Sequence, residues 1–341
     1  KKCEIRTGRA AYSRKFMEPE SIVSSVKRRI AEDSKFSFNG ATISNMQIAE
    51  AIISDFIKEI KSTDHNFSPN VVVITVPYYY GENENALIKQ AIENVIVRDI
   101  NSVPSFFIIP EPVAASLSCL YNIKETSINS KIFLIYDIGG GTLDMTLVRI
   151  TNDLTSFSYE VLANDGMAWF GGDDIDQFIY EYVTTHEQID FSNLTEQQQI
   201  VNKARLMEEC IEAKHHLSSS ESYDFMCPNL FGIEQGYIEL TITRDKLESL
   251  ITGDNINKRN MISELNECVE RLYSKAKIER ESVDYVVPVG GTSIIPIFRQ
   301  CLKNSHKNSK ELLSDTQSDS FVLVANGASI YGALKSDEIY K

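Results

Sequence analysis

The chain has 341 residues, of which 43% are hydrophobic and 24% are charged, as is ordinary for a globular protein. That length predicts two or more domains or lobes. The formal net charge of −14 argues against non-specific binding to nucleic acid, which needs clustered lysine and arginine. No apolar run approaches the length of a membrane span, so we expect neither nucleic acid nor membrane as a partner.

The six cysteines are scattered without a Cys-x-x-Cys pair, and the five histidines show no metal-ligand spacing. We therefore expect buried, unreactive thiols in a reducing compartment such as the cytoplasm. The sequence begins with Lys1 and not with methionine, so we expect it to start inside a longer protein. The endoplasmic reticulum or another organelle therefore stays open as an alternative location.

The first half of the chain alternates helical and extended patterns. Ser44, followed three residues later by Gln47, predicts a capping box at the start of an amphipathic helix. The other predicted elements of this half are a short helix over 22–30, a buried strand over 71–76, a helix over 86–96, a strand over 106–109 and a helix of small residues from Ala114.

Glu111 lies between Pro110 and Pro112. Because proline fixes φ and disfavours helix before it, this glutamate is expected at a strand-to-helix turn. From this fragment alone, a plain loop glutamate is an equally good interpretation.

The second half continues the alternation. Pro288 inside a β run predicts an edge or distorted strand end, because proline cannot donate to a neighbouring strand. Pro296 suits the first turn of a helix. The other predicted elements of this half are helices over 175–182, 197–217, 262–276 and 325–334, strands over 223–226, 237–242 and 285–289, and a helix capped by Thr243.

The segment 132–148 carries the strongest functional signal. An apolar run enters Asp-Ile-Gly-Gly-Gly-Thr-Leu-Asp at 137–144 and leaves with a period of two, which predicts strand, tight turn, strand. Glycines let such a turn bring several backbone N–H groups to one anion. Asp137 and Asp144 would repel a bare phosphate, so a divalent cation or ordered water is expected between them and the phosphate. The alternative is an ordinary hairpin whose glycines only permit the bend.

No Gly-x-x-x-x-Gly-Lys-Ser/Thr and no Gly-x-Gly-x-x-Gly occurs, which argues against Walker-type and Rossmann-type nucleotide sites. Six other segments carry a different pattern. They are Val-Ile-Thr-Val-Pro-Tyr-Tyr at 73–79, Pro-Glu-Pro-Val-Ala-Ala at 110–115, the glycine segment at 137–144, Gly-Gly-Asp-Asp-Ile-Asp at 171–176, Ala-Lys-His-His-Leu-Ser-Ser-Ser at 213–220 and Val-Gly-Gly-Thr-Ser-Ile-Ile-Pro at 289–296.

In this order, these segments resemble the nucleotide-binding domain of the 70-kDa heat-shock chaperone family (DnaK-like), within the actin-like ATPase superfamily. The resemblance implies an α/β fold with two lobes of two subdomains each around a central nucleotide cleft, the N-terminal part of the first lobe being missing. The implied subdomains are 1–45 and 46–126 in the first lobe, and 127–171 with 259–341 and 172–258 in the second.

The resemblance further implies binding of ATP or ADP with Mg²⁺, and K⁺ is an additional candidate ion. It places Lys27 near the attacking water, and Glu111 beside the metal through water. Asp137 and Asp144 match the acidic pair that orders water and metal, and Thr142 contributes to the γ-phosphate site. The remaining implied residues are Gly139, Gly140 and Gly141 for the phosphates, Gly172, Lys214, His215, Ser218, Gly290, Gly291, Thr292 and Ile294 for adenosine, and Pro112, Gly171 and Gly172 for coupling between the lobes.

The sequence also departs from the family pattern. The family's opening Asp-x-Gly-Thr hairpin lies upstream of Lys1. Ile211 stands for a ribose-binding glutamate, His215 and Ile294 stand for two arginines that flank the base, and Phe321 stands for a late aspartate. Each arginine is worth about 1 kcal/mol and the carboxylate roughly 1.5–3 kcal/mol. Uncompensated, these losses weaken nucleotide affinity about a hundredfold or more.

Two hypotheses follow. The first is a divergent chaperone ATPase domain that hydrolyses ATP with Mg²⁺ and works in protein folding and the stress response. The resemblance then implies a J-domain co-chaperone, a nucleotide-exchange factor and unfolded client peptides bound through a domain absent here, with the present domain monomeric. The second is a non-hydrolysing co-chaperone or interaction module with weak or lost nucleotide binding. An actin-like filament protein or a sugar kinase explains fewer of the motifs.

Overall fold

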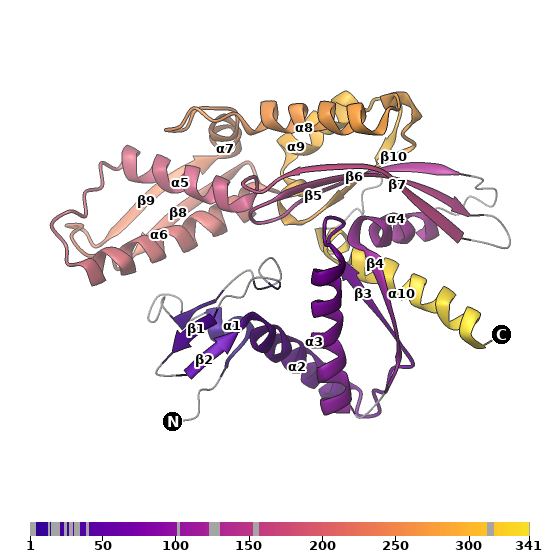
Figure 1. Cartoon of the computed structure of the whole chain (residues 1–341). Helices are drawn as coiled ribbons and strands as arrows, with labels where there is room; N and C mark the ends of the chain where they lie inside the picture. Colours follow the sequence, from indigo (N-terminus) through magenta and orange to yellow (C-terminus); the bar gives the residue numbers. More distant parts are fainter. Residues whose placement is uncertain are drawn as a thin grey trace. The chain divides into compact units, whose positions relative to one another are not determined.

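The computed structural model describes residues 5–12, 14, 21–23, 26, 30, 35–38, 41–100, 103–122, 130–152, 157–311 and 317–340 (Figure 1). Helices and strands alternate along most of this length, giving a mixed α/β fold with several small sheets. The chain divides into two compact units, one of Lys1–Glu111 with Ala328–Lys341 and one of Pro112–Gly327. Among the described helices, none has both the length and the apolar character needed to cross a lipid bilayer.

The first unit contains two small sheets. β1 (Lys35–Phe38) and β2 (Ala41–Ser44) form an antiparallel hairpin, whereas β3 (Val71–Val76) and β4 (Ser105–Pro110) pair in parallel. A parallel pair needs a crossover connection, which α3 (Glu82–Ile100) supplies. The other helices of this unit are α1 (Gly8–Tyr12), α2 (Asn45–Thr63) and the C-terminal part of α10 (Gln317–Tyr340).

α2 begins where the sequence predicts. The side chain of Ser44 accepts a hydrogen bond from the backbone amide of Gln47 at 3.3 Å, and the side chain of Gln47 accepts one from the backbone amide of Ser44 at 3.0 Å. These bonds satisfy amide groups for which the helix itself offers no partner. The buried side chain of Ile57 then packs with Val95 and Ile96 of α3 in one of the unit's apolar clusters.

The second unit is built on a five-stranded sheet with the order β11-β10-β5-β6-β7. β5 (Lys131–Ile138), β6 (Leu143–Asn152) and β7 (Phe157–Met167) form an antiparallel meander. β10 (Tyr285–Val289) joins the other side of β5 in parallel, and β11 (Lys310–Glu311) pairs in parallel with β10. The sheet therefore brings the end of β5 beside the end of β10, although about 150 residues of sequence separate them.

Pro288 lies one residue before the end of β10, a strand that lies between β11 and β5 in the sheet. Within the described residues, β11 pairs with β10 only at Tyr285 and Val286. On its other side, Pro288 has Tyr136 of β5 as its partner in the register.

Most of the remaining elements of the second unit enclose one large apolar core. Phe170, Phe225 and Phe298, which come from three distant segments, are all fully buried in it. α5, α6 and the β8–β9 hairpin lie together at one end of this unit in Figure 1. The bounds of all the remaining elements of this unit are α4 (Glu111–Asn122), α5 (Gly172–His186), α6 (Glu196–Leu217), β8 (Ser222–Pro228), β9 (Tyr237–Thr243), α7 (Arg244–Ile251), α8 (Met261–Ala276), η3 (Arg280–Ser282), η4 (Gly291–Ile294) and α9 (Pro296–Ser305).

Most predicted elements are confirmed, including the cap of α7 by Thr243 and the start of α9 at Pro296. Glu111 is indeed held at a strand-to-helix turn, because β4 ends at Pro110 and α4 begins at the next residue. Sequence analysis missed the β1–β2 hairpin, β7 and β11. The helix predicted over 22–30 falls largely outside the described residues.

The described cysteines are free thiols. Cys119, Cys210, Cys227 and Cys268 are buried, and Cys301 is half-buried. Burial raises the pKa of Cys119 and of Cys268 to about 12 and that of Cys227 to about 11. Thiols with such pKa values hold little thiolate at neutral pH, so the expectation of buried, unreactive cysteines is confirmed for these residues.

Candidate functional site

The turn between β5 and β6 combines glycines with two carboxylates. The backbone amide of Gly139 closes the turn by donating to the carbonyl of Thr142 at 3.0 Å. Asp137 of β5 and Asp144 of β6 are direct partners in the antiparallel register, so their side chains share one face of the sheet. Like charges directly opposite each other destabilise a sheet unless positive charge or donors offset them. The arrangement therefore favours a cation or donor groups beside the turn.

A second glycine pair packs against this turn. The amide of Gly172 donates to the carbonyl of Gly139 at 3.0 Å, and the amide of Asp173 donates to the carbonyl of Gly140. A Cβ added at Gly171 would lie 2.6 Å from the carbonyl oxygen of Gly140 and 2.7 Å from that of Gly139. Real side chains do not approach a carbonyl so closely, so α5 can begin here only because Gly171 has no side chain.

A third glycine segment lies on the other flank. Gly290 has a φ of +81°, and a Cβ added to it would lie 2.3 Å from Oδ1 of Asp137 and 2.6 Å from the carbonyl oxygen of Ile138. The hydroxyl of Thr292 donates to the carbonyl of Gly139 at 2.9 Å. The turn at 137–144 and the turn at Gly290 therefore lie side by side.

In the turn between β5 and β6, two backbone amides have no hydrogen-bond acceptor among the described residues. Within the described residues, the amides of Gly140 and Gly141 donate to no protein acceptor, and Gly140 is exposed. Adjacent unused amides in a glycine turn are typical of anion-binding concavities. We refer to these parts together as the glycine-turn site: 139–142 with Asp137 and Asp144, Gly171 with Gly172, and 290–292.

A buried ion pair adjoins the site. The Lys214 ammonium, on α6, donates to Oδ2 of Asp176 at 2.7 Å and to the carbonyl of Gly172 at 3.1 Å, and both charged side chains are less than a tenth exposed. Burial raises the pKa of Asp176, while the attraction of Lys214 opposes that rise. A Cβ added at Gly172 would lie 2.7 Å from the Lys214 nitrogen and 2.9 Å from the Thr292 hydroxyl. The pair therefore connects α5 and α6 at the edge of the glycine-turn site.

The other predicted adenosine residues lie on α6 and η4. Ser218 ends α6, and its hydroxyl donates to the carbonyl of Lys214 at 2.9 Å. His215 is exposed, in keeping with an ordinary helix residue. Gly291 and Ile294 of η4 are half-buried.

The remaining predicted residues are Glu111, Pro112, Lys27 and Phe321. Glu111 and Pro112 begin α4 and are both half-buried, and the carbonyl of Pro112 accepts a hydrogen bond from the Ser116 hydroxyl at 2.8 Å. Lys27 and the side chain of Phe321 lie outside the described residues. The roles proposed for them stay predictions.

The donor set fits Mg²⁺ better than a metal that needs a full protein cage. Across the part of the chain that the structure describes, no cluster of three histidine, cysteine, aspartate or glutamate side chains could hold a metal ion. Mg²⁺ usually keeps several waters and takes one or two carboxylates together with substrate phosphates. Asp137 and Asp144 at the glycine turn match that demand.

Two residues near the site escaped sequence analysis as functional candidates. Gly166 of β7 is the register partner of Asp144, and a Cβ added to it would lie 2.5 Å from the carbonyl oxygen of Leu143. Asp176 was seen only as part of a motif. Its position four residues after Gly172, one helical turn along α5, was the available signal that both face Lys214.

Arg259 was missed as well. Its guanidinium donates to Asp174 at 2.6 Å, to the carbonyl of Trp169 at 2.6 Å and to both carboxylate oxygens of Glu264. These carboxylates raise the pKa of Arg259. Asp174 in turn accepts a hydrogen bond from the amide of Gly171 at 2.8 Å. Arg259 thus holds the segment that carries the second glycine pair.

Known proteins share this sequence pattern. The family described as "Hsp70 protein" matches residues 1–340. The proteins named chaperone protein DnaK from Elusimicrobium minutum and Thermoplasma volcanium are 27% and 28% identical over 338 residues, which cover 97% and 98% of this chain and 50% and 51% of theirs. The chaperone protein DnaK of Carsonella ruddii is 30% identical over 296 residues, or 84% of this chain and 45% of that protein. The chain therefore spans about half the length of the curated relatives it matches.

Proposed function

The chain belongs to the Hsp70 family, and from this premise we propose that it binds Mg²⁺-ATP at the glycine-turn site and hydrolyses it as the ATPase domain of a chaperone. Members of this family are ATPases. The proposal includes the two-lobed arrangement with subdomains 1–45, 46–126, 127–171 with 259–341, and 172–258. It also includes coupling of the nucleotide state to lobe closure through Pro112 and Gly171.

One observation carries the proposal. Gly140 and Gly141 present amides with no protein acceptor in the described structure, at the turn where three separate glycine segments meet. The amides of Gly172 and Asp173 are already engaged by carbonyls of the same turn. Phosphate oxygens are the natural acceptors for the two remaining amides, because each amide is fixed in place and needs no reorganisation to bind them.

The carboxylates limit what can bind. Asp137 and Asp144 are negatively charged, so the site suits a phosphate ligand that brings a cation with it. Mg²⁺, when bound, would neutralise phosphate charge and attract the carboxylates through its waters. Asp137 and Asp144 would then hold and orient that water shell.

Hydrolysis needs little beyond this set of residues. Phosphoryl transfer depends mainly on positioning and on charge stabilisation, and it needs little covalent help from the protein. In our proposal the amides of Gly140 and Gly141 and the hydroxyl of Thr142 hold the γ-phosphate. Lys27 would lie near the attacking water, and Glu111 would act on the metal through water.

A second candidate function is favoured by the adenosine side. Ile211 is half-buried and His215 is exposed, and neither side chain can replace a carboxylate or a stacked guanidinium. A chain with these substitutions could serve as a non-hydrolysing interaction module with weak nucleotide binding. We place it second because it leaves the convergence of glycine segments unexplained.

The partners of the chain belong to the same proposal. A J-domain co-chaperone and a nucleotide-exchange factor would act on the present domain. Unfolded client peptides would bind through a segment beyond it, since the DnaK relatives are about twice as long as this chain.

Titration calorimetry with Mg²⁺-ATP and an assay of phosphate release test the proposal. We expect saturable binding, Mg²⁺-dependent turnover, and a loss of roughly 10- to 100-fold in turnover for Asp137→Asn, which acts on the metal through water. Asp190→Asn makes the same chemical change at an exposed loop and should leave turnover unchanged. Absence of Mg²⁺-ATP binding would overturn the proposal. Binding without turnover, unchanged by Asp137→Asn, would establish the second candidate.

A further inference from the structure

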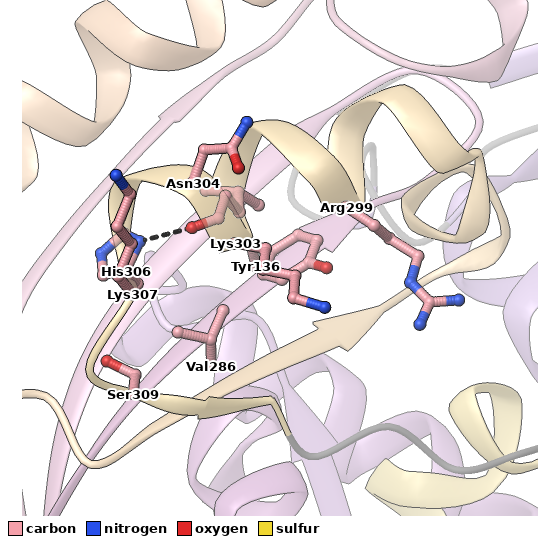
Figure 2. Close-up of a pocket in the computed structure, with 9 residues that line it drawn as sticks. Tyr136, Val286, Arg299, Lys303, Asn304, His306, Lys307 and Ser309 are labelled. Atoms are coloured by element: carbon pink, nitrogen blue, oxygen red, sulfur yellow. Dashed lines mark hydrogen bonds between the residues drawn. The ribbon is translucent and has the colours of Figure 1, made fainter.

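A pocket of about 360 Å³ lies in the second unit, apart from the glycine-turn site. Figure 2 shows it beneath α9, with side chains from α9, β5, β10 and the segment before β11 around it. None of the residues of the glycine-turn site lines it. Tyr136 of β5 lines the pocket, whereas its neighbour Asp137 belongs to the turn. Successive residues of a strand point to opposite faces, so the pocket and the Asp137 carboxylate lie on different faces of the sheet.

The pocket carries concentrated positive charge in an acidic protein. The segment 296–310 contains four lysine and arginine residues and no aspartate or glutamate, whereas the whole chain has 34 basic and 48 acidic residues. Arg299, Lys303 and Lys307 all line the pocket, and no carboxylate does. Lys303 and Lys307 are exposed, and neither has an acidic partner among the described residues. Two ammonium groups are therefore available to an incoming anion.

His306 contributes an uncharged side chain that two hydrogen bonds hold in place. Its Nδ1 is 3.0 Å from the carbonyl of Leu302, and its Nε2 is 2.7 Å from the hydroxyl of Tyr273. Burial lowers the pKa of His306. The imidazole is therefore neutral at pH 7, with its ring donating to the carbonyl and accepting from the tyrosine. The charge at the pocket consequently comes from the lysines and Arg299.

The interior of the pocket is largely apolar. Tyr136, Val286 and Leu302 line it and are each buried. A pocket with apolar walls and a few convergent polar groups is typical of small-molecule sites, where the apolar surface binds the body of the ligand and the polar groups orient it. A volume of this size lies at the lower end of the range for such sites.

We propose that this basic pocket binds a small organic anion, in which a phosphate or carboxylate group pairs with Lys303 and Lys307 and an apolar group packs on Val286. The proposal does not depend on ATP binding at the glycine-turn site. An ammonium group pairs with either anion as a point charge, so phosphate and carboxylate are both admitted. The apolar group distinguishes this ligand from a free inorganic ion.

Calorimetric titration of the whole chain with phenyl phosphate at low ionic strength tests the proposal. We expect saturable binding with a Kd on the order of 1 mM or tighter, weakening as KCl is added. Lys303→Glu combined with Lys307→Glu should weaken binding at least about tenfold, because both charge-assisted contacts are lost. Lys203→Glu combined with Lys258→Glu changes the same charge at two exposed positions of the same unit and should leave binding unchanged.

Asn304→Trp provides a second variant that does not alter charge. Asn304 is exposed and lines the pocket, so an indole there should obstruct it and weaken phenyl phosphate binding. Circular dichroism confirms that each variant is folded before it is titrated.

Several outcomes would overturn the proposal. The first is an absence of saturable phenyl phosphate binding. The second is an equal loss of binding affinity in the control variant, Lys203→Glu with Lys258→Glu. The third is unchanged affinity in both pocket variants. Displacement of phenyl phosphate by Mg²⁺-ATP would instead assign its binding to the glycine-turn site. Inorganic phosphate that binds as tightly as phenyl phosphate would remove the apolar part of the proposal and contradict the ligand class. Benzoate distinguishes carboxylate from phosphate as the preferred anion.

Discussion

The glycine-turn site and the proposed adenosine residues His215 and Ile294 are built differently. In the glycine-turn site, an added Cβ at Gly171 would come within 2.6 Å of the carbonyl of Gly140, and one at Gly290 would come within 2.6 Å of the carbonyl of Ile138. On the adenosine side, α6 and η4 offer side chains such as His215 and Ile294. A site made of backbone tolerates almost no substitution at its glycines. A site made of side chains can change its chemistry while the fold stays the same.

The ion pair on the adenosine side should show the largest effect. Lys214→Met leaves the Asp176 carboxylate buried without its cation, and breaking a buried pair in this way costs about 3–5 kcal/mol. The free energy of unfolding, from urea titration followed by circular dichroism, measures the loss. Asp176→Leu added to Lys214→Met should recover most of it, since no charge then stays buried. Equal losses for the single and double variants would show that the pair is not coupled.

Gly290→Ala, in the glycine-turn site, should have the next largest effect on stability. The new methyl group would collide with Asp137 and with the carbonyl of Ile138, and the positive φ adds strain of its own. Together these effects should destabilise the protein by about 2–4 kcal/mol and weaken Mg²⁺-ATP binding. Gly236→Ala is the matched control, because Gly236 has a φ of +75° but nothing within 4 Å of its added Cβ. It should cost about 1–2 kcal/mol. A similar cost for both variants would mean that the close approach at Gly290 is unimportant.

Acid should act in opposite directions on two buried carboxylates of the second unit, Asp165 and Asp176. Asp165 of β7 is next to Gly166; burial opposes its ionisation, but hydrogen bonds from Arg271 and Lys275 and from the Gly166 amide lower its pKa. Its contribution to stability is therefore present above its ordinary value of 3.8 and lost as the pH falls below it. The raised pKa of Asp176 has the opposite sign, so its contribution falls as the pH rises from its ordinary value to its raised one.

Asp165→Asn tests this difference. At neutral pH it should destabilise the protein by about 1 kcal/mol, because its cationic partners are largely exposed. The difference from the parent protein should shrink toward zero between about pH 5 and pH 2, as the parent carboxyl takes up its proton. Unfolding by urea at a series of pH values measures it. A difference that stays constant with pH would attribute the effect of Asp165→Asn to packing.

The smallest effects are expected from restoring cations to the adenosine side. His215→Arg and Ile294→Arg each supply a guanidinium plane of the kind that stacks on a base, worth about 1 kcal/mol or roughly fivefold in the Kd for Mg²⁺-ATP. Calorimetry measures the change, and Mg²⁺ with tripolyphosphate, which has no base, serves as the control ligand. Tighter tripolyphosphate binding in either variant would mean that the new arginine acts on the phosphates.

The local parts of the fold could be predicted from sequence. The β5–β6 hairpin, the capping box at Ser44 and the turn at Glu111 each depend on a few neighbouring residues with strong conformational preferences. β7 could not be predicted in the same way, because its residues are largely half-buried or exposed and it carries no clear alternation. A register shift opposite Leu147 and Val148 further breaks its period of two. Its existence depends on pairing with β6, and no short sequence pattern encodes that pairing.

The candidate site shows the same division. The glycine segments were found from sequence because runs of glycine beside aspartate are locally distinctive. Asp176 and Arg259 were missed because their importance depends on distant partners, Lys214 across 38 residues and Trp169 across 90. The pairing of β10 with β5, which brings Gly290 to Asp137, likewise depends on sheet order and not on local sequence. Only the family resemblance indicated that these segments belong together.

Trp169 gives the protein an optical reporter of its own. It is the single tryptophan of the chain, its side chain is 82% exposed, and its carbonyl is held by Arg259. The next residue, Phe170, donates its amide to the carbonyl of Gly141. Any ligand that shifts the central turn therefore acts one residue away from an indole in water, whose emission colour and accessibility to iodide quenching respond to such a shift. Occupancy of the turn can thus be followed by intrinsic fluorescence, without attaching a dye.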